Sequence, residues 1–325
     1  MNKEEFFAQI MEGISFFEEN EKVEIKNYYE ELILDGMEVG ASQEEVIEKL
    51  DHPKAIVERL KTEYAKPDRN KETQEQTANN GEYIPNGKVS VVKIQAEDRS
   101  VRILPSSDDQ VRIRYEAQDD DEIIFHEIDG VFYFRQRERR KFSFLKFNFS
   151  RGDASIYLEV PKNLIHQIEV STKNGGIKCI DFVDDCSIFL ETSNGGIKIE
   201  NVIAKKIELR TTNAGVSIHS VKSNQCTAKS TNSIIKVCDG AFAEKLSMQS
   251  TNGALKVDRV IAPDIEMKTT NGPIKGTILG KNSDYEIHSQ TSNGSNNMPN
   301  GWGSGKEKKL SVSTSNGSIA IEFVE

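Results

Sequence analysis

The chain has 325 residues, a formal net charge of −10 and 36% hydrophobic residues, so its length allows two or three domains. Residues 1–66 hold 17 acids and 8 bases, a net charge of −9, which leaves 35 acids and 34 bases in the rest of the chain. This acidity excludes nucleic acid as the expected partner of the N-terminal region. Because no apolar run has the length of a signal peptide core or a membrane span, we expect a cytoplasmic protein, peripheral at the membrane if it meets one.

Residues 1–66 predict a compact helical domain. Apolar residues recur at helical spacing over residues 3–19 and 21–39. Ser42 followed by Glu45 is a capping-box signal for a short helix. Pro53 then stands in the first turn of a last helix that ends near Tyr64. The polar residues 67–87 predict a flexible linker.

Residues 88–325 predict a β domain. Residues 88–160 alternate like strands but lack a strict repeat, so we expect irregular first coils that cap one end. Residues 161–325 carry a repeat of about 20 residues, Ser/Thr-x-Asn followed by a small residue. Its eight asparagines are Asn174, Asn194, Asn213, Asn232, Asn252, Asn271, Asn293 and Asn316.

The positions around each Asn identify the architecture. Apolar residues recur six and four positions before the Asn and three and five positions after it. This is the pattern of strand, turn and strand with one buried face. One unit cannot bury its own apolar face, whereas stacked units can, so the repeat predicts a single-stranded β-solenoid. Up-and-down hairpins are the alternative, and they would not require one turn chemistry in every copy.

The Asn suits a bend because it tolerates the left-handed backbone region and bonds its own local backbone. Stacked Asn side chains are expected to bond one another along the solenoid axis, and the Thr/Ser row two positions earlier is expected to do the same. A ligand-binding Asn row is the functional alternative. The residue after each Asn is small, and we attribute this to a strained backbone at the bend, Gly253 being one example.

The cysteines and histidines give no sign of a metal or cofactor. All four cysteines lie in the repeat region, with Cys179 and Cys226 at predicted core positions. Neither the cysteines nor the five histidines have metal-ligand spacing. We therefore expect no cofactor and a reducing compartment.

Two known families resemble parts of the chain. Residues 1–66 resemble the helical HAAS module, through Glu30-Glu31, Ser42 to Leu50 and His52 to Ile56. The resemblance implies a bacterial signalling or partner-binding role. Residues 88–325 resemble the bacterial β-strand-repeat family labelled "putative adhesin", through Val160-Pro161-Lys162-Asn163-Leu164 and the repeated Thr/Ser-Asn-Gly-x-Ile. Some members of that family are linked to cell-envelope stress, which this resemblance adds as a context.

Three features are candidate binding surfaces. Lys178, Lys198, Lys236, Lys256 and Lys275 stand four positions after their asparagines, with Ser217 interrupting. They form either a solvated face or a strip for a polyanion, such as an anionic membrane surface or a polymer. Residues 132–151 interleave seven bases with seven aromatics and include Arg137, Arg139, Arg140 and Lys141. They predict either a hairpin over the solenoid end or a surface for lipid or nucleic acid.

Trp302, the only Trp, lies in a Gly-rich stretch at 295–308 that interrupts the repeat. It is either a contact point or part of a plug for the core at Asn296. A free solenoid end at Ile319 to Phe323 could pair with a second copy, so a homodimer is a candidate assembly.

These patterns favour a non-enzymatic interaction or scaffold protein. The helical module would bind a protein partner, and the solenoid would offer a recognition surface. A surface adhesin or carbohydrate-binding solenoid is the alternative. A solenoid hydrolase or lyase is the third hypothesis, because Asp181, Asp184 and Asp185 form the one acid cluster of the repeats.

Overall fold

The computed structural model describes residues 2–15, 22, 25–26, 29–30, 33, 42–50, 52–64, 81–117, 121–138, 155–301 and 303–325. Two compact units emerge, one helical and one built of strands, and each is described by itself. The strand unit confirms the predicted β-solenoid, and the helical region precedes it in sequence.

The helical unit contains α1 (Lys3–Gly13), α3 (Gln43–Lys49) and α4 (Pro53–Tyr64). Both α1 and α3 begin with a capping box, and the predicted one is present: the Glu45 amide donates to Ser42 Oγ (3.2 Å) and the Ser42 amide donates to the Glu45 carboxylate (2.9 Å). The apolar faces meet in one core, which includes Phe6, Phe7, Ile10, Ile14, Ile25, Tyr29, Ile33, Val46, Ile47, Ile56 and Val57.

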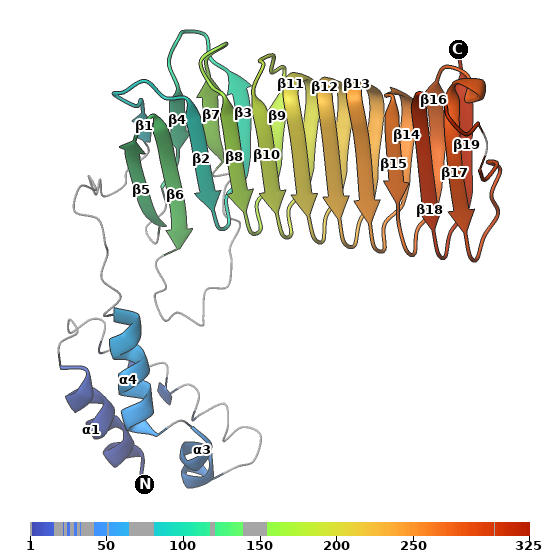
Figure 1. Cartoon of the computed structure of the whole chain (residues 1–325). Coiled ribbons are helices and arrows are strands. Elements are labelled where there is room, and N and C mark those ends of the chain that lie inside the picture. Colours follow the sequence, from blue (N-terminus) through green and yellow to red (C-terminus); the bar gives the residue numbers. More distant parts are fainter. Residues whose placement is uncertain are drawn as a thin grey trace. The chain divides into compact units, whose positions relative to one another are not determined.

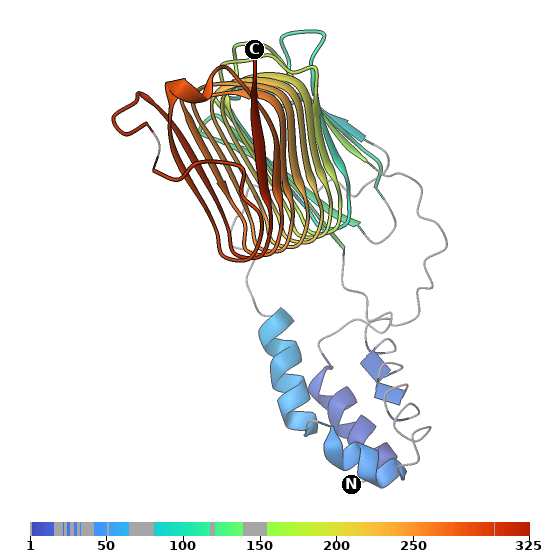
Figure 2. The same ribbon diagram turned by 90° about the vertical axis from the view of Figure 1, so that its right-hand side faces the viewer.

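The strand unit is one curled, hydrogen-bonded sheet, seen from the side in Figure 1 and along its axis in Figure 2. The irregular part contains β1 (Gly81–Tyr83), β2 (Val91–Ala96), β3 (Val101–Pro105), β4 (Arg112–Tyr115), β5 (Asp121–Ile128), β6 (Val131–Glu138) and β7 (Ile156–Val160). The regular part begins with β8 (Gln167–Thr172), β9 (Ile177–Ile180), β10 (Ser187–Thr192), β11 (Ile197–Thr211), β12 (Val216–Ser230) and β13 (Ile235–Ser250). It ends with β14 (Leu255–Ile261), β15 (Asp264–Lys268), β16 (Ile274–Leu279), β17 (Tyr285–Thr291), β18 (Lys308–Thr314) and β19 (Ile319–Val324).

Each repeat makes one coil, with a strand on either side of the Asn turn. Strands before the turn stack into a first sheet, and strands after it stack into a second sheet. Within the regular part every coil pairs in parallel with its neighbours. This parallel register excludes the up-and-down hairpins. The predicted apolar positions fill the shared interior, as the full burial of Ile188, Leu190, Ile197 and Ile199 illustrates.

The turn asparagines form a hydrogen-bonded ladder along the axis, which confirms that prediction. The Asn194 amide donates to Asn174 Oδ1 (2.6 Å), and Asn213, Asn232, Asn252 and Asn271 continue the ladder at 2.6–2.8 Å. The Thr/Ser row behaves differently from our expectation. Thr192 Oγ1 accepts the Gly195 amide (3.1 Å) and donates to the Gly175 carbonyl of the neighbouring coil (3.0 Å), so these hydroxyls bond backbone instead of one another.

The left-handed backbone lies elsewhere than predicted. None of the eight turn asparagines has a positive φ. For the first five asparagines, a positive φ occurs seven positions later, where the chain leaves the second sheet; these residues are Asp181, Asn201, Ser220, Asp239 and Arg259, at 50–54°. The small residue after the Asn has a steric cause instead. A Cβ on Gly253 would lie 1.8 Å from the Ser233 carbonyl oxygen of the neighbouring coil.

At both ends of the solenoid, neighbouring coils do not follow one another in the order of the sequence. At the N-terminal end, β2 lies between β6 and β8. The coil that comes first in the sequence is therefore the second along the solenoid axis, and β6 lies outside it. At the C-terminal end, β18 lies between β15 and β17. Accordingly, Asn316 donates to Asn271 and accepts from Asn293, each at 2.8 Å. The repeat pattern contains no signal for this order.

Antiparallel strands cover the N-terminal end. β5 pairs with β6, while β4 pairs with β7 and β1 pairs with β4. Residues 81–87, which we assigned to the linker, therefore belong to the strand unit: Gly81–Tyr83 is a strand, and the Asn86 and Gly87 amides donate to the Glu127 carboxylate. Tyr83 stacks on Phe125 and Phe132, with ring centroids 4.6 and 5.5 Å apart.

A buried ion pair holds the first turn against this cap. Arg99 takes part in the turn that precedes the repeats, and its Nη2 lies 2.7 Å from Asp121 Oδ2. Both side chains are almost fully buried, and Gln136 donates to the other Asp121 oxygen (2.7 Å). The segment 97–100 is thereby fixed in the place that later coils give to the Asn turn, and Asp98 accepts from Asn174 at the end of the ladder.

The irregular stretch that follows Asn293 covers the C-terminal end. The Asn297 side chain donates to the Ile321 carbonyl (2.9 Å) and accepts the Ile321 amide (3.0 Å), so it pairs with β19 as a peptide group would. The Gly301 amide bonds the Ile287 carbonyl (3.0 Å), and Met298 packs against the core. The end at 319–323 is therefore less open than we expected. This supports the plug alternative for the residues around Asn296.

Candidate functional site

A row of lysines runs along the outer side of the second sheet. Because strand register places equivalent positions side by side, Lys178 pairs with Lys198, Ser217 with Lys236, and Lys256 with Lys275 in adjacent coils. We call Lys178, Lys198, Lys236, Lys256 and Lys275 the lysine row. All five side chains are exposed. At about 4.8 Å per coil the lysine row is about 24 Å long.

The lysine row has few counter-charges. Lys198 Nζ lies 2.6 Å from the Glu200 carboxylate. For the other four lysines, no ion pair exists with any residue that the structure describes. Arg102 continues the row at its N-terminal end, where it pairs in register with Lys178, and its guanidinium lies 5.6 Å from the Tyr157 ring centre. The sequence analysis missed Arg102 because β3 lies outside the repeat.

The two rows that flank the lysine row differ. On the turn side lie small or apolar residues, beginning with Gly176, Gly196 and Gly215. On the other side lies a row that includes carboxylates. Glu200 and Asp258 lie two residues after Lys198 and Lys256, and Glu322 lies two residues after Ala320, the register partner of Lys275. Asp258 accepts a hydrogen bond from Thr277 Oγ1 (2.9 Å). The lysine row is therefore a single line of positive charge, with an uncharged row on one side and a row that includes acids on the other.

The first sheet presents rows of mixed charge and a groove. In the row that faces outward from β2, β8 and β10, Lys93 pairs with Glu169 (3.0 Å), and Phe189 follows. Tyr133 lies on the other side of Lys93 and stacks on His126, with ring centroids 4.7 Å apart. The groove has a volume of about 530 Å³; its lining includes Lys93, Gln95, His126, Tyr133, Arg135, Glu169, Ser171, Phe189, Glu191, Glu208 and Arg210.

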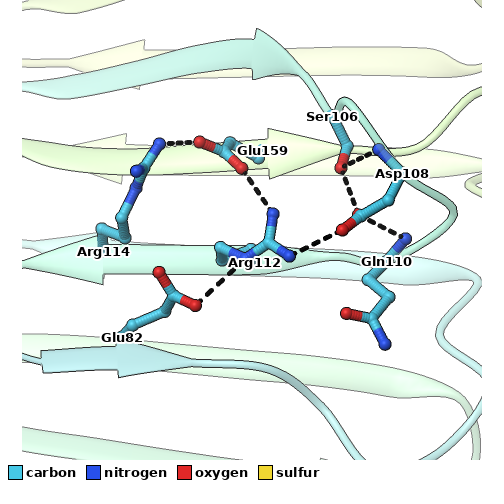
Figure 3. A network of polar contacts seen from close by, with 7 residues as sticks. All are labelled: Glu82, Ser106, Asp108, Gln110, Arg112, Arg114 and Glu159. Atoms are coloured by element: carbon cyan, nitrogen blue, oxygen red, sulfur yellow. Dashed lines mark hydrogen bonds and ion pairs between the residues drawn. The ribbon is translucent and has the colours of Figure 1, made fainter.

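A network of charges at the N-terminal end is structural. Figure 3 shows Arg112 between three carboxylates: Glu82 at 3.2 Å, Asp108 at 2.8 Å and Glu159 at 2.8 Å. Glu159 also pairs with Arg114. The network joins β1, β4 and β7, whose pairing closes this end of the second sheet. Each group already has its partner, so the network offers no free charge to a ligand.

The remaining candidate residues are placed as follows. Arg137 lies on β6 and pairs with Glu122, which balances its charge. Arg139, Arg140, Lys141 and Trp302 lie outside the described residues, as do the aromatic residues Phe142 to Phe149 of the same segment. Phe132 and Phe134, at the start of that segment, are core residues. Among the described residues, the structure thus places the lysine row and Arg137 on different strands, with the lysine row on β9, β11, β13, β14 and β16 and Arg137 on β6.

The acid cluster at 181–185 has structural partners. Asp181 accepts from the Asn201 amide (2.8 Å), and Asp184, which is buried, accepts the Asn163 and Asp185 amides. Among the described residues, no group of three or more His, Cys, Asp or Glu side chains is arranged to hold a metal ion. These carboxylates stabilise turns, and their geometry gives no support to the hydrolase hypothesis.

The cysteines are thiols, and three of the four are buried. Burial raises the pKa of Cys186 and of Cys226 to about 12, and it raises the pKa of Cys179 as well. A thiol that stays protonated at neutral pH is a poor nucleophile and a poor metal ligand. Cys179 and Cys226 therefore act as core residues. No helix among the described residues has the length and apolarity to span a membrane.

The fold defines the class of protein as a parallel β-solenoid with an N-terminal helical module. Residues 89–322 match the Toastrack DUF4097 family, and because this is well over half of the chain, the chain belongs to that family. Residues 5–59 match the HAAS family. Both resemblances drawn from the sequence are confirmed.

A comparison with solved structures finds several matches. One is described as a putative adhesin from Parabacteroides merdae ATCC 43184; it has 12% identity and a TM-score of 0.44, and the match covers 76% of this chain and 97% of that chain. A putative adhesin from Bacteroides fragilis NCTC 9343 has 13% identity, a TM-score of 0.36 and coverages of 74% and 97%. A putative cell adhesion protein from Clostridium sporogenes ATCC 15579 has 10% identity, a TM-score of 0.29 and coverages of 75% and 100%. A search of curated proteins finds no match.

Proposed function

We propose that this chain is a bacterial interaction scaffold in which the helical module binds a protein partner and the solenoid presents a recognition surface. The observation that carries the proposal is the contrast between the two units. The helical unit is acidic, and the solenoid is a regular stack with a row of exposed lysines and, among its described residues, no cluster of His, Cys, Asp or Glu side chains that could hold a metal ion. A role in envelope-stress signalling, peripheral to the cytoplasmic membrane, fits this division.

The helical unit offers a defined acidic surface for a partner. Glu44 and Glu48 are exposed on α3 and lie one helical turn apart, on one face. Neither takes part in the capping box, whose acid is Glu45. Their charge can therefore be reversed without removing the contacts that begin the helix.

The test is affinity capture with the full chain from a bacterial lysate that includes the membrane fraction. We expect a protein partner that is lost in the variant Glu44→Lys/Glu48→Lys. The matched control is Glu116→Lys/Glu307→Lys, which makes the same charge change at exposed positions of the strand unit and is expected to retain the partner. Equal capture by all three proteins would refute the proposed role of the helical module.

A carbohydrate-binding solenoid is the second candidate function, and the groove on the first sheet supports it. The formal charges of its lining cancel, because three bases (Lys93, Arg135, Arg210) balance three acids (Glu169, Glu191, Glu208). His126 also lines the groove. Half-buried Tyr133 and Phe189 add aromatic surface on the two sides of the Lys93–Glu169 pair. A neutral ligand with many hydroxyl groups and apolar patches, such as an oligosaccharide, suits this lining.

Titration calorimetry with cellotriose, maltotriose and chitotriose tests this second function. We expect one of the three to bind, and both Tyr133→Ala and Phe189→Ala to weaken that binding. Thr227→Ala is the matched control, since Thr227 lies two coils beyond Phe189 in the same outward row. An absence of binding by all three sugars, or equal weakening in the control, would remove the saccharide alternative.

A further inference from the structure

We propose that the lysine row is a track for a linear phosphate polymer. The inference rests on the proposed function, because it names the class of ligand for the recognition surface of the solenoid. It makes no use of the helical module or of its partner. The ligand would lie along the solenoid axis, with its phosphates opposite successive lysines.

The backbone fixes the positions of the ammonium groups before any ligand arrives. Four of the five lysines lie between two buried residues of their own strand, as Lys198 does between Ile197 and Ile199, and Lys275 lies between buried Ile274 and half-buried Gly276. Neighbouring lysines are partners in the parallel register of their strands, Lys178 with Lys198, Lys236 with Lys256 and Lys256 with Lys275. Because the Cβ positions are set by the sheet, a ligand orders only the outer part of each side chain. Such preorganisation lowers the entropic cost of binding.

The charges of the lysine row are not balanced locally. Exposed like charges about 4.8 Å apart repel one another, so the row is stabilised by anions. One outward row of the first sheet balances its charges within the protein, since Lys245, Asp264, Lys309 and Glu286 follow one another in register and Lys245 lies 3.1 Å from Asp264 and 3.0 Å from Glu266. Within the described part of the chain, the lysine row has one such pair, Lys198–Glu200. This difference between the two rows indicates an anionic ligand for the lysine row.

The borders of the row favour a linear ligand over a flat one. A planar anionic membrane that contacted the row would also meet the acids beside it, Glu200, Asp258 and Glu322, and would be repelled by them. A polymer chain can avoid them by lying toward the turn side, where the flanking residues carry no charge; these are Gly176, Gly196, Gly215, Ile234, Ala254 and Pro273. We therefore infer a linear ligand.

The length of the row predicts selectivity for long polymers. A ligand must span about 24 Å to reach from Lys178 to Lys275, given about 4.8 Å per coil. Triphosphate meets two or three lysines at most, whereas a longer chain meets all five and releases more counter-ions. Ser217, which is half-buried in the middle of the row, interrupts the charge. It is the one position where a lysine would complete the row.

Binding of the purified full chain to fluorescent polyphosphate about 45 phosphates long, measured by anisotropy at several salt concentrations, tests the inference. We expect Lys236→Glu/Lys256→Glu to weaken binding more than about tenfold, since each lysine near an anionic surface contributes about fivefold. Lys229→Glu/Lys268→Glu, which changes the same charge on the first sheet, is expected to change binding by less than about threefold. Thermal unfolding of each variant checks that the fold is retained.

Gain of binding gives a second, independent measurement. Ser217→Lys is expected to tighten polyphosphate binding about fivefold and to steepen its salt dependence by about one ion. Thr227→Lys adds the same charge on the first sheet, where Glu208 lies beside it in register, and is expected to have little effect. An equal gain in both variants would mean that net charge alone drives binding, and it would overturn the track.

The remaining arms distinguish other ligands. Triphosphate that binds as tightly as polyphosphate would overturn the linear track, and so would vesicles with phosphatidylglycerol that bind while polyphosphate does not. If polyphosphate fails to bind but the partner captured through α3 is retained, this inference is wrong and the proposed function stands. If polyphosphate binds and no partner depends on Glu44 and Glu48, the polyphosphate track stands and the proposed role of the helical module is wrong.

Discussion

The regular coils and the two ends of the solenoid solve the same problem by different means. In the regular coils, each unit bonds the next copy of itself: asparagine meets asparagine, and each Thr/Ser hydroxyl meets the carbonyl of the preceding turn. At the ends no further copy exists. There the chain uses antiparallel strands, the buried Arg99–Asp121 pair and the side chain of Asn297. The comparison teaches that repetition supplies its own partners, whereas an end must be built from unique contacts.

The largest expected effect is at the N-terminal end. Asp121→Ala leaves Arg99 as an uncompensated buried charge, which should lower the free energy of unfolding by about 3–5 kcal/mol. Chemical denaturation measures this loss. Glu122→Ala is the neighbouring control, since its pair with Arg137 is more exposed, and we expect a loss below about 1 kcal/mol. Replacing both partners, in Arg99→Met/Asp121→Leu, should recover most of the stability; no recovery would show that the pair is not the main contact.

The close stacking of the regular coils is tested at Gly253. The variant Gly253→Val places a Cβ against the Ser233 carbonyl, so we expect a loss of about 1–3 kcal/mol from the forced shift of one coil. The control is Gly196→Val. Gly196 lies two residues after its asparagine instead of one, and a Cβ there would lie 3.5 Å from the nearest atom. The stability of this control should stay within about 0.5 kcal/mol of the parent. Equal losses at both sites would contradict the steric explanation.

The C-terminal end can be compared directly with the ladder. Asn297→Ala removes both hydrogen bonds to Ile321 and leaves that backbone unpaired, with an expected loss of about 1–2 kcal/mol. Asn232→Ala removes two ladder bonds at an exposed position and should cost about 1 kcal/mol or less. Denaturation midpoints of the two variants measure the difference. The same loss in both would mean that the end needs no special cap.

The smallest expected effect concerns pH and Glu127. Burial by itself raises the pKa of Glu127, but hydrogen bonds from the Gly87 amide, the Tyr83 hydroxyl and the Asn86 amide outweigh it and hold the pKa below its usual value. A lowered folded-state pKa contributes stability above the unfolded pKa of about 4.3, and this stability is lost as the pH falls through the folded pKa. Glu127→Gln should therefore flatten the fall in stability between pH 7 and pH 3 by less than about 1 kcal/mol. An unchanged slope would contradict this role of Glu127.

The sequence by itself determined the solenoid, its period, its buried positions, the asparagine ladder and the lysine row. These follow from a local pattern, because the same spacing in every copy places equivalent residues side by side once the copies stack. The resemblance to two families was likewise carried by local motifs.

Only the tertiary structure decided the rest. At both ends, the order of the coils along the axis differs from their order in the sequence. This order depends on which strand edges remain free after stacking, and the sequence of a single repeat does not determine it. The buried pair of Arg99 with Asp121, the addition of Arg102 to the lysine row and the groove between Tyr133 and Phe189 join residues that are far apart in the sequence or lie outside the repeat. The small residue after each asparagine looked like a backbone requirement, but it is imposed by the carbonyl of the neighbouring coil. Contacts between coils are absent from a local pattern, so they become visible only in the folded stack.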